Sequence, residues 1–245
     1  MKRLAWFIFK SPQRKWVGWH SLFTDFTGST EWLLNGLLRP NRNKTVWVCV
    51  GIKDRTEPFL THLLPSLAAQ AREQNLALSV WDCGSIDASR IESAIQQVWP
   101  TQWVFHSSPS PFARSMAFNK AMNLASGELL FACDADMTVP DKLGEKVRRN
   151  TGQRYAWFPV CQWQLDPEKE AWKWFSAGTG LFSATKKQLE STGGYDEGFT
   201  EWGKEDWDLF FRFYAKGIMP LRTRCDGLYH HWHPSSKPDN FIPMF

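Results

Sequence analysis

Two aspartates separated by one residue stand directly after an apolar run in the first half of the chain. Asp134 and Asp136 follow the run at 129–133, which has the length and composition of a buried strand. The carboxyl ends of strands are where open α/β sheets bind their ligands. Two carboxylates there are hard oxygen donors that suit Mg²⁺ or Mn²⁺, and such an ion can carry a diphosphate. The alternative is a capped turn before a helix near Asp141.

A second acid cluster opens an aromatic segment with helical spacing. Glu205, Asp206 and Asp208 follow Trp202 and Gly203. A carboxylate here can take the proton from an attacking hydroxyl while a leaving group departs. Acids in a first turn also stabilise a helix N-terminus, which accounts for one or two of the three without any chemistry. Together the two acid clusters predict metal-dependent transfer of a group from a nucleotide.

Three of the six histidines fall within four residues: His230, His231 and His233. Clustered histidines are more often ligands or acid–base groups than core residues. A metal held by aspartate oxygens needs further ligands, and one imidazole would serve. In an extended segment His231 faces away from His230, because successive side chains alternate between faces. An all-histidine zinc site is the competing interpretation.

Cationic and acidic side chains near other predicted strand ends are candidates for binding a phosphorylated ligand. Arg114 opens a helical segment, and Lys53 and Arg55 follow the first predicted strand. Guanidinium groups match phosphate oxygens in geometry and charge, whereas surface solvation is the alternative for each. Asp82 ends the second predicted strand. It can accept a hydrogen bond from a uracil N–H or a ribose hydroxyl, or it can cap the following turn.

The elements that must position these residues alternate between strand and helix. Strands are predicted at 46–50, 76–81, 103–105, 129–133, 155–163 and 178–183. Helices are predicted at 57–74, from Asp87 to Val98, and at 112–125, 185–191 and 205–216. The alternation in the first half is typical of a parallel α/β sheet. No Gly-x-Gly-x-x-Gly follows the first strand and no P-loop sequence occurs, which disfavours those two nucleotide-binding folds.

The bulk composition is that of a globular protein. The chain has 245 residues, 43% of them apolar and 22% charged, which excludes a disordered protein. Its fifteen tryptophans suit stacking on sugar rings, although core filling accounts for most of them. Residues 1–45 carry eight Lys and Arg against two acids, and the remainder carries 21 basic against 23 acidic residues. We therefore expect no nucleic-acid partner. The arm at 1–44 either contacts an anionic membrane surface or is a solvated lead-in.

The cysteines bear on the cellular compartment. The chain has five, with no CxxC pair, which indicates buried free thiols in a reducing compartment rather than disulfides or a zinc site. The apolar segment Leu4–Phe9 is too short for a signal peptide or a membrane span. We expect a cytoplasmic location, with any membrane contact at the inner face.

In their order along the chain, these residues resemble the GT-A glycosyltransferases, in particular the β-1,4-galactosyltransferase and chondroitin N-acetylgalactosaminyltransferase group. The run from Gly193-Gly194-Tyr195-Asp196 to Trp202-Gly203-Lys204-Glu205-Asp206-Trp207-Asp208 is similar to that group's Gly-Gly-Phe…Trp-Gly-x-Glu-Asp-x-Asp signature. The resemblance covers residues 45–235. It implies a single α/β domain of the GT-A fold, whose mostly parallel central sheet is flanked by helices. A nucleotide half at 45–137 and an acceptor half at 138–235 are expected, followed by a tail at 236–245.

The resemblance also implies a reaction. The donor would be a UDP-sugar and the acceptor a saccharide, in polysaccharide or glycoconjugate synthesis. Mn²⁺ or Mg²⁺ would be held by Asp136 and a downstream histidine. His230 and His233 both match that ligand, with His230 slightly favoured. Asp206 would be the base of an inverting reaction, and Glu205 would hold the acceptor. The residues expected around the donor are Arg55, Asp82, Arg114, Asp134 and Trp202.

Three alternatives remain open on the sequence. A retaining enzyme of the same fold needs no base opposite the leaving group. A non-catalytic sugar-binding module would need only the pockets and the tryptophans. A nucleotidyltransferase also uses paired aspartates, but it would release pyrophosphate instead of UDP.

Overall fold

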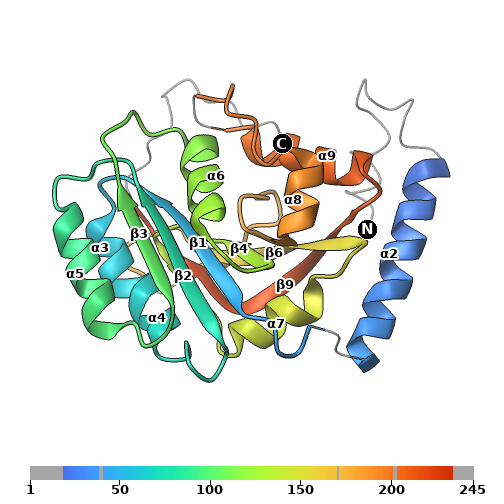
Figure 1. Ribbon diagram of the computed structural model, residues 1–245, viewed down its shortest axis with the longest axis horizontal. Helices are drawn as coiled ribbons and strands as arrows, with labels where there is room; N and C mark the ends of the chain where they lie inside the picture. Colours follow the sequence, from blue (N-terminus) through green and yellow to red (C-terminus); the bar gives the residue numbers. More distant parts are fainter. Residues whose placement is uncertain (1–18, 39–40, 170, 201–202, 234–245) are drawn as a thin grey trace.

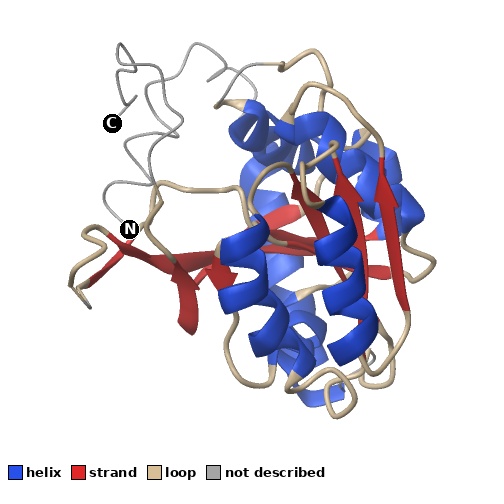
Figure 2. Ribbon diagram, turned by 90° about the vertical axis from the view of Figure 1, so that its left-hand side faces the viewer, coloured by secondary structure: helices blue, strands red, loops and turns tan. Residues whose placement is uncertain are grey.

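A computed structural model describes residues 19–38, 41–169, 171–200 and 203–233 of the chain (Figure 1). Residues 1–18 of the predicted arm, Trp202 and the predicted tail at 236–245 lie outside the described residues. Within the described ranges, one nine-stranded sheet runs through the molecule, and helices lie on both of its faces (Figure 2).

The strands are β1 (Val46–Ile52), β2 (Leu76–Asp82), β3 (Trp103–Ser107), β4 (Leu129–Ala132), β5 (Met137–Thr138), β6 (Tyr155–Gln164), β7 (Trp172–Trp174), β8 (Phe182–Thr185) and β9 (Met219–His230). The helices are α2 (Trp19–Leu38), α3 (Thr56–Pro58), the π-helical turn η2 (Phe59–Leu63), α4 (Leu64–Ala68), α5 (Ala88–Val98), α6 (Arg114–Leu124), α7 (Leu143–Asn150), α8 (Lys186–Thr192) and α9 (Glu205–Ala215).

The first half of the chain forms the parallel part of the sheet. β3, β2, β1 and β4 lie side by side in that order, and each neighbouring pair is parallel. Every residue of β1 is buried, which explains why this strand is a continuous apolar run. Because the strands are parallel, their carboxyl ends share one edge of the sheet, where Asp82 ends β2 and Asp134 follows β4.

The second half of the chain extends the same sheet with strands of both directions. β8 is antiparallel to β4 and to β6, while β9 is parallel to β6. β5 and β7 pair antiparallel with β9 and β6. The expected α/β architecture is present, and its sheet is mixed because of these later strands. The β5–β9 pairing sets Met137 opposite His230 and so joins the first acid cluster to the histidine segment.

Alternate residues of β1 point into two cores, one on each face of the sheet. Val46, Val48 and Val50 belong to a core that includes side chains of η2, α4, α5 and α7. Trp47 and Cys49 belong to a second core that includes side chains of α6, α8 and α9. The helices that carry the candidate residues Arg114 and Glu205 therefore cover the same face of the sheet.

α2 lies at the end of the molecule opposite β3, against α7, β6 and β9 (Figure 1). The predicted arm thus contains a helix of 20 residues. Among the helices of the described ranges, none combines the length and the hydropathy that a membrane span requires.

Gly51 allows β1 to approach α6, the helix that begins at Arg114. A Cβ on Gly51 would lie 2.7 Å from the Cβ of Ala117 and 3.2 Å from the backbone nitrogen of Phe118. Since backbone cannot yield as a side-chain tip can, we expect Gly51→Ala to lower the free energy of unfolding by ~1–3 kcal/mol. Urea unfolding measures this change.

Gly198→Ala is the matched control for that variant. Gly198 is exposed, and the nearest atom to its added Cβ is a carboxylate oxygen of Asp196, 3.1 Å away. We expect a change within ~0.5 kcal/mol, as is usual at the surface. Equal losses in the two variants would contradict a close approach specific to β1 and α6.

Candidate active site

Asp136, His230 and His233 come together as a group that can hold a metal ion. One ligand atom from each lies within 4.8 Å of the others. Asp136 Oδ1 lies 3.4 Å from His230 Nε2, and Asp136 Oδ2 lies 3.3 Å from His233 Nε2. Asp136 is 6% exposed, and its Oδ1 is buried without a hydrogen-bond partner. The β5–β9 pairing builds this group, and the backbone N–H of His231 donates to the Asp136 carbonyl at 2.9 Å.

His231 faces away from the metal-ligating group, as the alternation of an extended segment predicts. Its Nε2 lies 2.8 Å from Thr138 Oγ1, and its ring stacks on His62 with the centroids 3.5 Å apart. Burial, together with the neighbouring His62 and His230, lowers the pKa of His231 to about 4. The three histidines therefore do not form the all-histidine zinc site that was the competing interpretation.

Arg55 contacts the metal-ligating group through His233. Arg55 Nη2 lies 3.1 Å from His233 Nδ1. A guanidinium can only donate, so Nδ1 is the acceptor in this arrangement. A neutral His233 then carries its proton on Nε2, the nitrogen that faces Asp136. His230 has Trp163 stacked on its ring, with the centroids 4.4 Å apart.

Arg114 connects the two acid clusters. Its Nε and Nη2 donate to Asp134 Oδ1 at 3.2 and 3.0 Å, and its Nη1 lies 3.7 Å from Glu205 Oε1. Further donations go to Tyr195 Oη at 3.1 Å and to the Gly180 carbonyl at 2.8 Å. Burial opposes the charge of Arg114, but the surrounding acidic groups, led by Asp134, raise its pKa well above the usual value. The guanidinium is therefore a permanent cation between the clusters.

Glu205 is the more deeply buried acid at the start of α9. It is 5% exposed, and its Oε2 is buried without a hydrogen-bond partner. Burial raises the pKa of Glu205, an effect that the nearby Arg114 partly offsets and Asp206 reinforces. A carboxyl group in this state can accept from, or donate to, a polar group that enters the site.

Asp206 is half-buried, and three donors fix its carboxylate. Oδ2 accepts from the backbone N–H and from the hydroxyl of Thr179, at 3.3 and 2.9 Å, and Oδ1 accepts from the backbone N–H of Trp207 at 2.9 Å. Arg222 fixes the backbone just before Thr179, because it donates to the carbonyls of Ser176 and Gly178 at 2.6 Å each. Asp206 is therefore a carboxylate of fixed orientation.

Asp208 has a structural partner on its own helix. Its Oδ2 accepts from Arg212 Nε at 2.8 Å and lies 2.7 Å from Arg212 Nη2. Arg212 in turn donates to the carbonyls of Thr192 and Gly194, which ties α9 to the end of α8. This ion pair explains the third acid of the cluster without any catalytic role.

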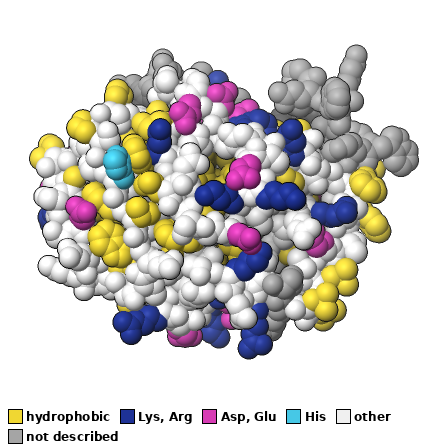
Figure 3. Space-filling model, in the orientation of Figure 1, with side chains coloured by type: hydrophobic (Ala, Val, Ile, Leu, Met, Phe, Trp, Pro, Cys, Tyr) yellow, Lys and Arg dark blue, Asp and Glu magenta, His cyan; other side chains and the backbone are white. Residues whose placement is uncertain are grey.

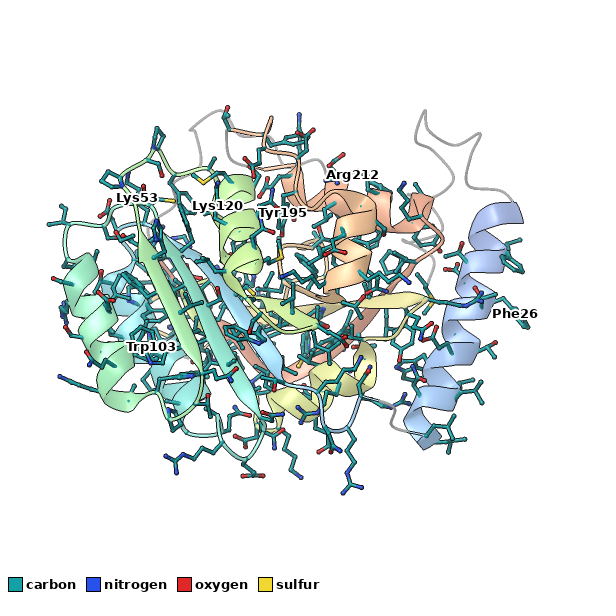
Figure 4. All side chains as sticks on the ribbon, viewed as in Figure 1. Phe26, Lys53, Trp103, Lys120, Tyr195 and Arg212 are labelled. Carbon is teal, nitrogen blue, oxygen red and sulfur yellow. The ribbon has the colours of Figure 1, made fainter. Side chains whose placement is uncertain are left out.

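The remaining predicted residues lie at the same edge of the sheet but are engaged with neighbouring loops. Asp82 is fully buried and accepts from the backbone N–H groups of Gly84 and Ser85 and from the hydroxyls of Ser85 and Ser107. This is the turn-capping geometry that the sequence left open. Lys53, which is labelled in Figure 4, donates to the Ser110 carbonyl at 2.7 Å.

Partly buried aromatic side chains lie beside the metal-ligating group. Trp163 stacks on Phe175 as well as on His230, with 4.1 Å between the centroids of the first pair. On the neighbouring strands Trp172 packs on Tyr229, with the ring centroids 4.6 Å apart. Sequence reasoning assigned no role to Trp163, Thr179 or Arg222. The general excess of tryptophan was a signal for Trp163, and the resemblance to the family runs through Thr179.

A sequence profile of a known family covers this part of the chain. The family described as the N-terminal domain of galactosyltransferase matches residues 163–234, which include both acids of the Glu205–Asp206 pair and all three clustered histidines. The resemblance predicted from the sequence is confirmed.

Curated relatives extend the match. Chondroitin sulfate synthase 3 of Mus musculus is 27% identical over 150 residues, which are 54% of this chain and 17% of that protein. Chondroitin sulfate N-acetylgalactosaminyltransferase 2 of Mus musculus is 24% identical over 225 residues, which are 80% of this chain and 41% of that protein. The chain thus spans less than half the length of these relatives. The second of these relatives is named as a glycosyltransferase, which is the enzyme class that the sequence predicted for this chain.

A solved structure shows the same fold. The mannosyltransferase PcManGT from Pyrobaculum calidifontis, in complex with GDP-Man and Mn²⁺, superposes with a TM-score of 0.57. The alignment covers 90% of this chain and 69% of that chain at 15% sequence identity. The predicted GT-A fold is therefore confirmed.

Glu205→Gln should stabilise the protein at neutral pH. Because the folded-state pKa of Glu205 is raised, its ionisation disfavours the folded state, and this cost appears as the pH rises above the ordinary value of 4.5. The gain should be ~1 kcal/mol at pH 7 and should vanish below about pH 4. Thermal unfolding at both pH values measures it.

Asp208→Asn is the matched control, since it neutralises an acid in the same turn of α9. It removes the ion pair with Arg212 and should lower stability at pH 7. A loss of stability in Glu205→Gln at pH 7 would contradict the raised pKa of Glu205.

Proposed function

We propose that this chain is an inverting, metal-dependent glycosyltransferase that moves a hexose or N-acetylhexosamine from a UDP-sugar to a saccharide acceptor. The observation that carries the proposal is that the fold brings Asp136 together with His230 and His233, and sets Glu205 beside Asp206. Of these five residues, all except Asp136 lie in the part of the chain that the family profile covers. The two relatives are named for the synthesis of chondroitin sulfate and for the transfer of N-acetylgalactosamine. Their names support polysaccharide or glycoconjugate synthesis as the setting.

Asp136, His230 and His233 fit a divalent cation. Oδ1 of Asp136 is buried, has no hydrogen-bond partner and lies 3.4 Å from His230 Nε2. The two imidazoles suit a first-row transition metal, and the carboxylate suits Mn²⁺ or Mg²⁺. We propose Mn²⁺ or Mg²⁺, which when bound would neutralise charge on the departing UDP. His230 is the histidine that can bind without rearrangement. His233 must first lose the contact with Arg55 that keeps its proton on Nε2.

The first half of the chain, residues 45–137, would hold the donor. Arg55 would lie near the nucleotide, and Arg114 with Asp134 near the diphosphate. Arg114 stays charged and offers positive potential where negative charge develops. Asp82 would shape the nucleotide pocket through the turn that it caps. Trp202 remains a proposed pocket residue on the strength of the resemblance.

The second half, residues 138–235, would hold the acceptor and supply the base. The acceptor oxygen attacks the anomeric carbon on the side opposite UDP, its proton passes to the carboxylate of Asp206, and the bond to UDP breaks. Thr179 and the N–H of Trp207 hold that carboxylate in one orientation. Glu205 would bind an acceptor hydroxyl. The Trp163–Phe175 stack offers an aromatic face of the kind that packs on sugar rings.

The five cysteines support a cytoplasmic setting for this reaction. All are buried and unpaired, as the sequence predicted, and burial raises the pKa of Cys161 to about 12. Such thiols are inert and suit a reducing compartment.

Asp136→Asn should abolish metal binding and, with it, the metal-dependent activity. Wild-type protein should be stabilised by Mn²⁺ and should release UDP from a UDP-sugar panel only with Mn²⁺ or Mg²⁺ present. The variant should lose the Mn²⁺-induced rise in Tm and at least ~100-fold in UDP release, because a metal ligand matters at least as much as the groups that orient it. Asp141→Asn, an exposed acid outside the site, should behave as wild type. Metal-stimulated turnover in Asp136→Asn would refute the ligand assignment.

Asp206→Asn should lose turnover while keeping donor binding. Removing a general base costs ~10²–10⁴-fold in kcat, whereas UDP affinity in Mn²⁺ should stay within about twofold. UDP-release assays and calorimetric UDP titration separate the two quantities. NMR of the product anomer in the wild type decides between inversion and retention, and pyrophosphate release would point to a nucleotidyltransferase. A sugar-binding protein would bind the panel without releasing UDP.

A further inference from the structure

The amphipathic helix α2 is attached to the molecule by its polar face. On most surface helices the apolar face packs on the core and the polar face meets water. On α2 the large apolar side chains of the opposite face are each at least 50% exposed. They are Leu22, Phe23, Phe26, Leu33, Leu34, Leu37 and Leu38. Figure 3 shows hydrophobic side chains along this flank, and Figure 4 shows Phe26 pointing away from the body.

Hydrogen bonds fasten the inner face of α2 to the rest of the fold. Asp25 accepts from the Tyr214 hydroxyl, Trp32 Nε1 donates to Asn150 at 3.0 Å, and Asn35 donates to the Tyr155 hydroxyl at 3.0 Å. Glu31 accepts from two backbone N–H groups, those of Gln153 and Arg154, at 2.6 and 2.8 Å. The outward direction of the apolar face is therefore set by specific partners.

These contacts also remove negative charge from the outer surface of α2. Asp25 and Glu31 are its only acids, and both face inward. The sequence before the helix, residues 1–18, carries five Lys and Arg and no acid, and Arg39 and Arg42 follow the helix. Arg42 is exposed. An uncharged apolar stripe lies between two basic stretches of sequence.

We propose that the outer face of α2 lies on an anionic membrane surface, with its axis parallel to the bilayer. Leu22, Phe26, Leu33 and Leu37 recur at helical spacing and would enter the acyl boundary. The exposed Arg42, and the positive charge of the sequence on either side of the helix, would add electrostatic attraction to anionic lipids. A protein partner would need polar groups around such a stripe. From Leu22 to Leu38, the exposed residues of α2 other than the apolar ones are Ser29 and Thr30. The surface is separate from the metal-ligating group and does not depend on the proposed reaction.

A vesicle-binding experiment on the full chain tests the proposal. Wild-type protein should float with vesicles of equal parts phosphatidylglycerol and phosphatidylcholine, should bind far less to phosphatidylcholine alone, and should be released by high salt. The variant Phe26→Gln/Leu33→Gln/Leu37→Gln should bind at least ~10-fold less, because the buried apolar area drives insertion. Ile86→Gln/Leu165→Gln, which alters two exposed apolar side chains elsewhere, is the control and should bind as wild type.

Two results would overturn the proposal. One is vesicle binding by the triple variant at the wild-type level. The other is a wild-type protein that ignores vesicles and is a dimer in sedimentation equilibrium, with the triple variant monomeric, which would make a second copy the occupant. UDP release by the folded triple variant reports the proposed reaction independently. The exposed positions of all three substitutions keep unfolding from imitating either result.

Discussion

The arrangement of the candidate site depends on one partly buried cation. Arg114 stands between Asp134 and Glu205, with Asp206 next to Glu205, and carboxylates gathered in a half-buried space repel one another unless a cation lies among them. The guanidinium group of Arg114 is planar and always protonated, so it can donate hydrogen bonds to Asp134 while another of its nitrogens faces Glu205. The close packing of β1 and α6 at Gly51 places this residue, since Arg114 is the first residue of α6. Packing in the first half of the fold thus sets the electrostatics of the second.

The second constraint is the long strand β9. It runs beside β6 in parallel and then pairs with β5, so one strand ends in His230 opposite the residue that follows Asp136. A shift in register between Val160 and Gln162 lies just before Trp163, the residue that stacks on His230. Bulges of this kind redirect side chains near functional sites. Sheet pairing therefore builds both the metal-ligating group and the aromatic wall beside it.

The parts that the sequence predicted are those fixed by local patterns. The first four strands follow from apolar runs, and the opposed faces of His230 and His231 follow from strand alternation. β9 escaped prediction because it contains Pro220 and Gly227 and no continuous apolar run. The contact of Arg114 with Glu205 could not be predicted, because it joins residues far apart in the sequence. The Asp208–Arg212 ion pair could have been predicted, because four residues separate the two side chains in the helix expected at 205–216. Residue types and their spacing in the sequence identified the acidic candidates, but only the fold showed which partners each of them has.

The exposed surface of α2 is another feature that local sequence patterns do not predict. Its apolar spacing identifies which side chains share a face, and the usual inference is that this face packs inward. In this fold the apolar face instead points outward, because Asp25, Glu31 and Asn35 hydrogen-bond to α9, to the loop before β6 and to β6. A count of charge along the sequence treats both acids as part of the exposed arm. Because the side chains of Asp25 and Glu31 face inward, the outer surface of α2 carries no acid and is more apolar than the composition of the arm indicates. Both properties favour contact with an anionic lipid surface.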